Sequence, residues 1–327
     1  MKSFHCSCGQ RLFFESTDCV ACGRVLGFDP ESRQLLSFAP GKGPNLQSAH
    51  GGWFRHCRNR PDYGACNWLL PADGQPGYCA ACRLNDVVPD LTRPGNLLLW
   101  QRLELAKRRL IYSLTGLRFT AMPRFRFLED QQRNPDVADA VVVTGHADGV
   151  ITINIAEADD ASRHAVREQM FERYRTLLGH FRHECGHFVF PYLVSTPESL
   201  AGFRELFGDE RAPYAEALQA YYEAGPSPDW QATRVSAYAS AHPVEDWAES
   251  FAHYLHITDA LETAAAFGMA GATAGSSADW ISEWGQLSVM LNEMNRSLGI
   301  DDAYPFVIAA PVVRRLQFIH RLAGSAG

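Results

Sequence analysis

The middle of the chain carries a short run of residues whose types and spacing suit zinc chemistry. The run is 183-HECGH-187, inside 180-HFRHECGHFVF-190. His183 and His187 are four residues apart, so on a helix they share one face and can bind one metal ion. Glu184 follows the first histidine, where its carboxylate can take a proton from a zinc-activated water as that water attacks a carbonyl. The alternative interpretation is a surface helix with two solvated histidines.

The surroundings of this run favour a buried metal site over a solvated helix face. Gly186 precedes His187, and its missing side chain would let another segment approach the metal side of the helix. The flanking side chains of Phe181, Phe188 and Phe190 are apolar, which indicates a buried helix. Cys185 belongs to the same apolar stripe and is predicted to pack in the core without binding zinc.

A second segment, 238-YASAHPVEDWAESFAHYLH-256, supplies carboxylates that could complete the site. Pro243 can open a helix at its first turn. Glu245 and Glu249 are then four residues apart on one face. One carboxylate would complete a site of two histidines and a glutamate, leaving the fourth position to water, while the other would hydrogen-bond the outer nitrogen of a ligand histidine. His253 or His256 is an alternative third ligand.

The N-terminal part of the chain is rich in cysteine. Eight of the nine cysteines lie between Cys6 and Cys82. In a reducing compartment such clusters indicate metal ligands, and four thiolates fill a tetrahedral zinc site completely, which makes it structural. We predict two such sites of consecutive cysteines: Cys6, Cys8, Cys19 and Cys22, then Cys57, Cys66, Cys79 and Cys82. Interleaved sets, or His5, His50 or His56 in place of a cysteine, are the alternatives.

The pattern of apolar residues predicts the elements that would position these groups. Helical spacing favours an amphipathic helix over 97–117 and a long helix over about 161–190 that Pro191 would end. Two β-branched runs joined by a Gly/Asp turn in 139–155 predict an antiparallel hairpin. Its 150–155 strand is expected to present an exposed edge to a substrate backbone. The Ala/Gly/Ser-rich stretch 264–278 reads as a loop.

Composition limits the class of protein. The 327 residues are 46% hydrophobic and 20% charged, as in an ordinary globular protein, and the net charge of -7 gives no basic footprint for nucleic acid or an anionic membrane. There is no apolar run of the roughly 18 residues that span a bilayer and no signal-peptide core. We therefore expect a cytoplasmic protein without membrane contact. The cysteine distribution divides it into a tandem zinc-ribbon region, 1–88 (ribbons at about 1–39 and 50–88), and a larger domain, 89–327.

Taken together, these motifs resemble a known family. HECGH followed by HPVEDWAESF resembles the gluzincin type of zincin metallopeptidase, in which a downstream glutamate is the third ligand. The cysteine knuckles, CNWLLP (66–71) and CRLND (82–86) extend the resemblance over nearly the whole chain to a bacterial zinc-ribbon, zinc-binding metallopeptidase family. The resemblance implies His183, His187 and Glu245 as zinc ligands and Glu184 as the base. It further implies Glu249 as a partner of a ligand histidine and Tyr238 as a stabiliser of the oxyanion.

We therefore predict an α+β protein, in which two small zinc ribbons precede a zincin-like domain with an antiparallel hairpin and an active-site helix. It would bind one catalytic and two structural Zn²⁺ ions and hydrolyse a peptide or amide bond in a peptide or protein substrate. The ribbons are candidates for contact with protein or nucleic acid. The alternative is a non-catalytic zinc-ribbon adaptor whose zincin domain is a scaffold. A third hypothesis is a latent enzyme whose ribbons cover the cleft.

Overall fold

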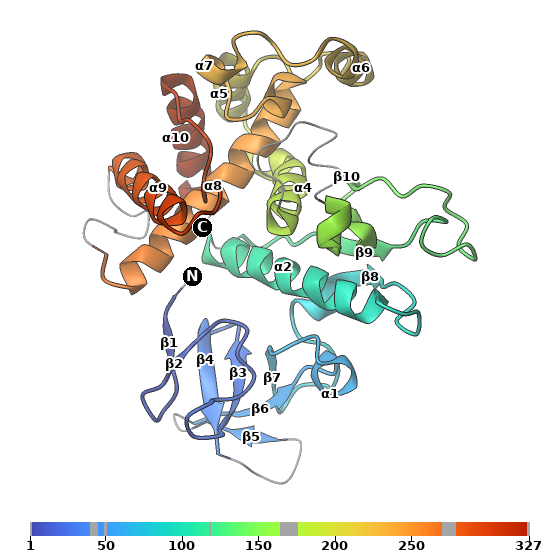
Figure 1. Ribbon diagram of the computed structural model, residues 1–327, viewed down its shortest axis with the longest axis vertical. Helices are drawn as coiled ribbons and strands as arrows, with labels where there is room; N and C mark the ends of the chain where they lie inside the picture. The colour runs from blue at the N-terminus through green and yellow to red at the C-terminus, as the bar shows by residue number, and fades with distance from the viewer. Residues whose placement is uncertain are drawn as a thin grey trace. The chain divides into compact units, whose positions relative to one another are not determined.

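The protein combines small sheets with a mainly helical part, so its class is α+β. The computed structural model (Figure 1) describes residues 2–39, 45–48, 51–117, 119–163, 176–269 and 279–325. It falls into two compact units. Unit 1 comprises the described parts of Met1–Tyr112, Met122–Thr144 and Thr152–Arg163; unit 2 comprises those of Ser113–Ala121, Gly145–Ile151 and His164–Gly327. No described helix is both long and apolar enough to cross a membrane.

Short strands build the cysteine-rich part of unit 1. Three antiparallel groups follow one another: β1 (Phe4–His5) with β2 (Arg11–Leu12), β3 (Val25–Asp29) with β4 (Gln34–Phe38), and β5 (Leu46–Gln47), β6 (Trp53–His56) and β7 (Leu69–Pro71). The short helix α1 (Asn59–Tyr63) and the 3-10 turn η1 (Cys82–Leu84) complete the segment. Gly9 and Gly23 follow cysteines with φ of 89° and 69°, a left-handed conformation that glycine adopts without a Cβ clash.

The predicted helix over 97–117 is confirmed as α2 (Asn96–Gly116), which begins in unit 1 and ends in unit 2. Its Tyr112 packs against Phe14 and Phe28 of the ribbons, with ring centroids 5.5 and 6.0 Å apart. The strand β8 (Asn85–Val87) pairs in parallel with β9 (Arg124–Leu128) beside it. An aromatic core thus joins α2 to the cysteine-rich segment.

The hairpin predicted in 139–155 is present but shorter, as β10 (Gly145–Ala147) and β11 (Val150–Asn154). Asp148 and Gly149 turn the chain with φ of 50° and 79°, the signature of a tight antiparallel turn. Ile151 and Ile153 are fully buried, as in a strand with one face in the core. The 140–144 run is not a strand. The expectation of an exposed edge on 150–155 is wrong, because β11 lies between β10 and β9 in the sheet order β10-β11-β9-β8.

The observed helix differs at both ends from the one expected over 161–190. Residues 164–175 lie outside the described part of the chain, as does His50. Helix α4 (Leu177–Leu193) begins after Thr176, whose backbone is extended. The Thr176 side chain caps the helix by accepting a hydrogen bond from the Gly179 amide. Pro191 does not end α4, which continues for two more residues. The predicted 264–278 loop overlaps the end of α8, and residues 270–278 lie outside the description.

Unit 2 is built on α4 and the long helix α8 (Pro243–Ala266), which pack against each other (Figure 1). As predicted, Pro243 is at the first turn of α8, where its missing N–H costs no hydrogen bond. His242 caps this end by accepting from the Val244 amide. The remaining elements are α5 (Pro197–Phe207), α6 (Tyr214–Ala224), α7 (Trp230–Thr233), η3 (Tyr238–Ser240), α9 (Trp280–Ser297) and α10 (Ala310–Ser325).

Candidate metal centres

A close approach of two helix backbones brings the two halves of the HExxH site together. A Cβ built on Gly186 of α4 would lie 2.7 Å from the Cα of Ala248 in α8, so only glycine fits. The buried Trp247 indole also donates to the Gly186 carbonyl at 2.9 Å. The prediction that Gly186 admits another segment is confirmed, and that segment is the glutamate helix.

Three ligand-type atoms converge where α4 faces α8. The Nε2 atoms of His183 and His187 are 3.2 Å apart. The Oε2 atom of Glu245 lies 3.1 Å from the first and 3.5 Å from the second. The two histidine side chains are 13% and 16% exposed, whereas that of Glu245 is 1% exposed. The cluster is therefore buried on the glutamate side and reachable from solvent on the histidine side.

This triangle fits a zinc ion. Zinc binds nitrogen and oxygen at about 2.0–2.2 Å, so tetrahedral geometry places its ligand atoms about 3.3–3.6 Å apart. The Oε2 of Glu245 is buried and lacks a hydrogen bond within the described structure, an arrangement that is costly without a cation. Three protein ligands leave the fourth position open, as in catalytic sites.

Glu249 fixes the orientation of His183. Its Oε1 lies 2.7 Å from the His183 Nδ1, and its Oε2 accepts a hydrogen bond from the Ser236 hydroxyl at 2.6 Å. A carboxylate on Nδ1 holds the imidazole hydrogen there, so the Nε2 lone pair points into the triangle. Glu249 thus occupies the outer position that the resemblance implies for it.

Tyr214 is a site residue that the sequence did not reveal. Its hydroxyl donates to Glu245 Oε1 at 2.6 Å, the oxygen that faces away from the histidines. Burial raises the pKa of Tyr214, and the hydrogen bond to Glu245 and the charges of Glu245 and Glu184 raise it further, so the phenol stays protonated. Tyr214 belongs to α6, 31 residues before its partner, and no local spacing signals the contact.

The two residues predicted to act on substrate lie next to the triangle. Glu184 follows His183 in α4 and is 9% exposed. The ring of Tyr238, in η3, lies beside His183 with centroids 5.8 Å apart. Burial, followed by the charge of Glu245, raises the pKa of Tyr238, which therefore remains a hydrogen-bond donor at neutral pH.

The alternative third ligands lie elsewhere. The Nδ1 of His253 is 2.5 Å from the Tyr304 hydroxyl, and the Nδ1 of His256 contacts a guanidinium nitrogen of Arg182. Neither belongs to the cluster of His183, His187 and Glu245. Cys185 is fully buried, and burial raises the pKa of its thiol, in keeping with a packing role.

The eight N-terminal cysteines form two further candidate centres of consecutive residues. Within each set, one sulfur per residue lies within 4.8 Å of every other. Sulfur pairs are 3.6 Å (Cys6–Cys22), 3.7 Å (Cys8–Cys19) and 3.7 Å (Cys66–Cys79) apart. Zinc–sulfur bonds of about 2.3 Å predict about 3.8 Å in a tetrahedron, so both sets fit zinc. No histidine joins either set among the described residues.

The second cysteine set lies against α2. Cys82 Sγ is 3.5 Å from Glu104, which also forms a buried ion pair with Lys107 at 2.8 Å. Arg108 is buried too, and the negative charge of nearby Cys66, Glu104, Cys82 and Cys79 raises its pKa against the opposing effect of burial. Four thiolates around Zn²⁺ carry a net charge of about -2, which this guanidinium partly balances.

Two family models match the chain, one after the other. Residues 96–322 match the family model described as "Putative zinc-binding metallo-peptidase", and residues 3–93 match a zinc-ribbon domain model. The chain belongs to this zinc-binding metallopeptidase family. The suspected family is thereby confirmed, and membership supports zinc binding and peptidase activity at the level of the family.

Mycobacterial relatives share nearly the full length of this metallopeptidase-family chain. An uncharacterized protein of Mycobacterium tuberculosis (strain ATCC 25618 / H37Rv) is 44% identical over 340 residues, covering 98% of this chain and 94% of its own. An uncharacterized protein of Mycobacterium bovis (strain ATCC BAA-935 / AF2122/97) matches to the same extent. No solved structure matches the chain.

Proposed function

We propose that this protein is a zinc-dependent peptidase that hydrolyses peptide or amide bonds. Family membership supports a zinc peptidase in general terms, and the arrangement of α4 and α8 supports the finer assignment. The observation that carries it is the convergence of two imidazole Nε2 atoms and a buried carboxylate oxygen within 3.1–3.5 Å, next to Glu184.

Each residue has a defined task in this proposal. His183, His187 and Glu245 bind the metal, and Glu249 holds the hydrogen on the Nδ1 atom of His183. When bound, zinc would polarise the scissile carbonyl and lower the pKa of a coordinated water. Glu184 takes the proton from the attacking water and delivers it to the leaving nitrogen. Tyr238 donates a hydrogen bond to the developing oxyanion.

The substrate backbone is proposed to pair with β10 instead of β11. β10 is at the end of the strand order, so one of its sides has no strand neighbour among the described residues. It packs on α4 through His146, whose ring lies 5.9 Å from that of Phe188. An extended peptide added to this edge would run alongside the helix that carries His183 and His187.

The first test is the zinc content of the full chain and of His187→Ala. Three candidate centres predict three zinc ions per chain, of which the variant loses one. Elemental analysis after removal of free metal gives both values. Equal zinc in the two proteins would remove His187 from the ligand set.

The second test separates chemistry from metal binding. Glu184→Gln removes the base and retains the shape, so zinc should remain while hydrolysis of a peptide library falls by about 10²–10⁴-fold. Glu198→Gln, an exposed position on α5, is the matched control and should be fully active. Unchanged activity in Glu184→Gln would exclude it as the base. A zinc-loaded wild type that cleaves no library peptide would instead favour the adaptor hypothesis.

A further inference from the structure

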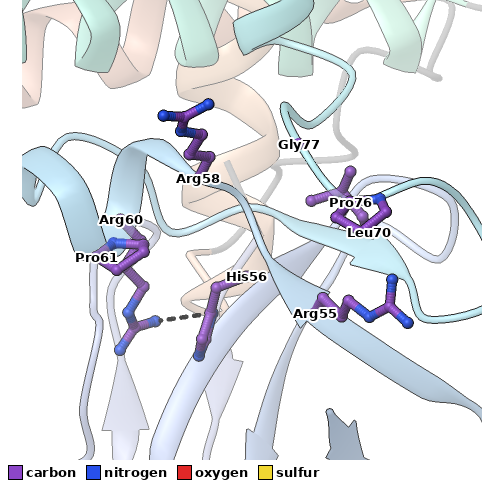
Figure 2. Close-up of a pocket in the computed structure, with 8 residues that line it drawn as sticks. All are labelled: Arg55, His56, Arg58, Arg60, Pro61, Leu70, Pro76 and Gly77. Carbon is purple, nitrogen blue, oxygen red and sulfur yellow. Dashed lines mark hydrogen bonds between the residues drawn. The ribbon is translucent and has the colours of Figure 1, made fainter. Parts of the chain in front are cut away.

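The second ribbon contains a pocket of about 560 Å³, within the range of roughly 300–1,000 Å³ typical of ligand sites. Figure 2 shows the residues around it, which come from β6, α1 and the residue before it (Arg58), β7 and the loop before Cys79. All of them belong to unit 1. The pocket is therefore separate from the cluster on α4 and α8.

The lining combines positive charge with an apolar wall. Its charged and titratable members are all basic: Arg55, Arg58, Arg60 and His56. Pro61, Leu70 and Pro76 provide apolar surface. None of the described residues that line the pocket is acidic, although the whole chain carries a net charge of -7. Such a local concentration of guanidinium groups in an acidic protein favours an anionic ligand.

The three arginines differ in how many of their N–H groups already form hydrogen bonds within the protein. Arg60 is structural, since it donates to the carbonyls of Leu26 and Thr17 and lies 3.4 Å from His56 Nδ1 (Figure 2). Arg55 donates from Nε to the Asn45 side chain and from Nη1 to the Gly74 carbonyl. Arg58 uses Nε for Asp62 at 2.9 Å, a pair whose arginine side chain is 65% exposed.

Within the described part of the chain, Arg55 and Arg58 therefore keep N–H groups for a ligand. An exposed ion pair such as Arg58–Asp62 contributes little and exchanges readily for another carboxylate. His56 adds a neutral donor, because an arginine next to Nδ1 leaves the ring hydrogen on Nε2. Burial, and then the Arg60 charge, lower the pKa of His56 to about 4, so the ring is uncharged at neutral pH.

We propose that this pocket binds an acidic peptide segment, with carboxylates on Arg58 and Arg55 and apolar side chains against Leu70 and the two prolines. Planar guanidinium groups match carboxylates in geometry, and the apolar wall suits side chains between the charges. A nucleic acid would need a continuous basic track, whereas Asp18 and Asp62 pair with the arginines here. The inference stands independently of the proposed hydrolysis.

Isothermal titration of the full zinc-loaded chain tests the proposal, with a short synthetic peptide of alternating Glu and Leu as the probe. Binding should weaken with added NaCl, and a peptide with Gln in place of Glu should not bind. Arg58→Gln should lower the affinity for the Glu–Leu peptide by about tenfold or more, and Arg55→Gln should also lower it. Arg83→Gln, exposed in the same ribbon but outside the pocket, should bind as the wild type does.

One further variant and two further probes complete the experiment. His187→Ala should bind the peptide normally, which separates the pocket from the proposed catalytic site. Inorganic phosphate and a single-stranded oligonucleotide are titrated in parallel. Tighter binding of either one, equal binding of the Gln peptide, or unchanged affinity in both arginine variants with wild-type zinc content would overturn the proposal.

Discussion

At the scale of single residues, Glu245 and Glu249 of the candidate centre each make a separate contact with each of their two carboxylate oxygens. Glu245 turns one oxygen toward the imidazoles and accepts the Tyr214 hydroxyl on the other. Glu249 binds the His183 Nδ1 with one oxygen and Ser236 with the other. Hydrogen bonds of this kind fix a ligand's direction before any metal arrives, because they restrict its rotamers.

Tyr214→Phe tests whether the outer contact to Glu245 affects the metal. Loss of the hydroxyl frees one carboxylate oxygen to rotate, so zinc affinity at this site should fall by about tenfold or more. Competition with a fluorescent chelator measures it. Tyr192→Phe removes an equivalent hydroxyl from a side chain that is 52% exposed, and its affinity should not change. Equal zinc affinities in the two variants would show that Tyr214 contributes by packing alone and does not support Glu245 as a ligand.

At the scale of elements, the crossing of α4 and α8 decides whether the ligands meet. Gly186 lets the two backbones touch at Ala248, and the Trp247 indole ties α8 to the Gly186 carbonyl. Next to the ligand glutamate, buried Asp246 pairs with Arg234 of the segment after α7 and with Arg315 of α10, at 3.2 and 3.0 Å. These contacts fix the rotational orientation of the first turn of α8 about the helix axis.

Gly186→Ala should therefore separate the helices. The new methyl group would meet backbone atoms of Ala248 at 2.7–3.0 Å, which cannot move aside as a flexible side chain would. We expect about 1–3 kcal/mol of destabilisation from overpacking, together with loss of one zinc ion. Urea unfolding and elemental analysis measure the two effects.

The matched control is Gly285→Ala in α9, where an added Cβ meets nothing within 4 Å. Alanine is the better helix former, so this variant should be slightly more stable than the wild type, by about 0.5–1 kcal/mol. A Gly186→Ala protein with wild-type stability and full zinc content would contradict the argument from close approach.

At the scale of the whole molecule, the ribbons share one core with the part of α2 that belongs to unit 1, which extends to Tyr112. Trp100 and Tyr112, each 1% exposed, pack on Tyr63 and on Phe14 of the cysteine-rich segment. Arg108 donates to the Ala65 carbonyl. The family models change over between residues 93 and 96, within the same compact unit. A boundary between sequence families is thus not a boundary between folded bodies here.

We expect that a fragment of residues 89–327 will not behave as an independent domain. Removal of the ribbons would expose the apolar face of α2 and leave buried Lys107 and Glu104 without their cover. The fragment should bind a hydrophobic dye and unfold at a lower temperature than the zinc-loaded full chain. Cooperative unfolding at the temperature of the full chain, without dye binding, would show that the ribbons are dispensable for folding.

The sequence by itself determined the features that depend on near neighbours. Two histidines four residues apart share a helix face whatever surrounds them, and Pro243 opens a helix because its ring fixes φ. The cysteine pairs likewise fell into two consecutive sets. These features depend on residue types and spacing within a short stretch of chain, which can be read without knowledge of distant segments.

Only the tertiary structure decided the features that depend on distant segments. Periodicity put Glu245 and Glu249 on one face, and the close packing of α8 on Gly186 determined which of them points between the imidazoles. The role of β11 as an inner strand depends on β9, and the contact of Glu245 with Tyr214 depends on α6, each more than 20 residues away in sequence. Such contacts are set by packing between elements, which a local pattern does not encode.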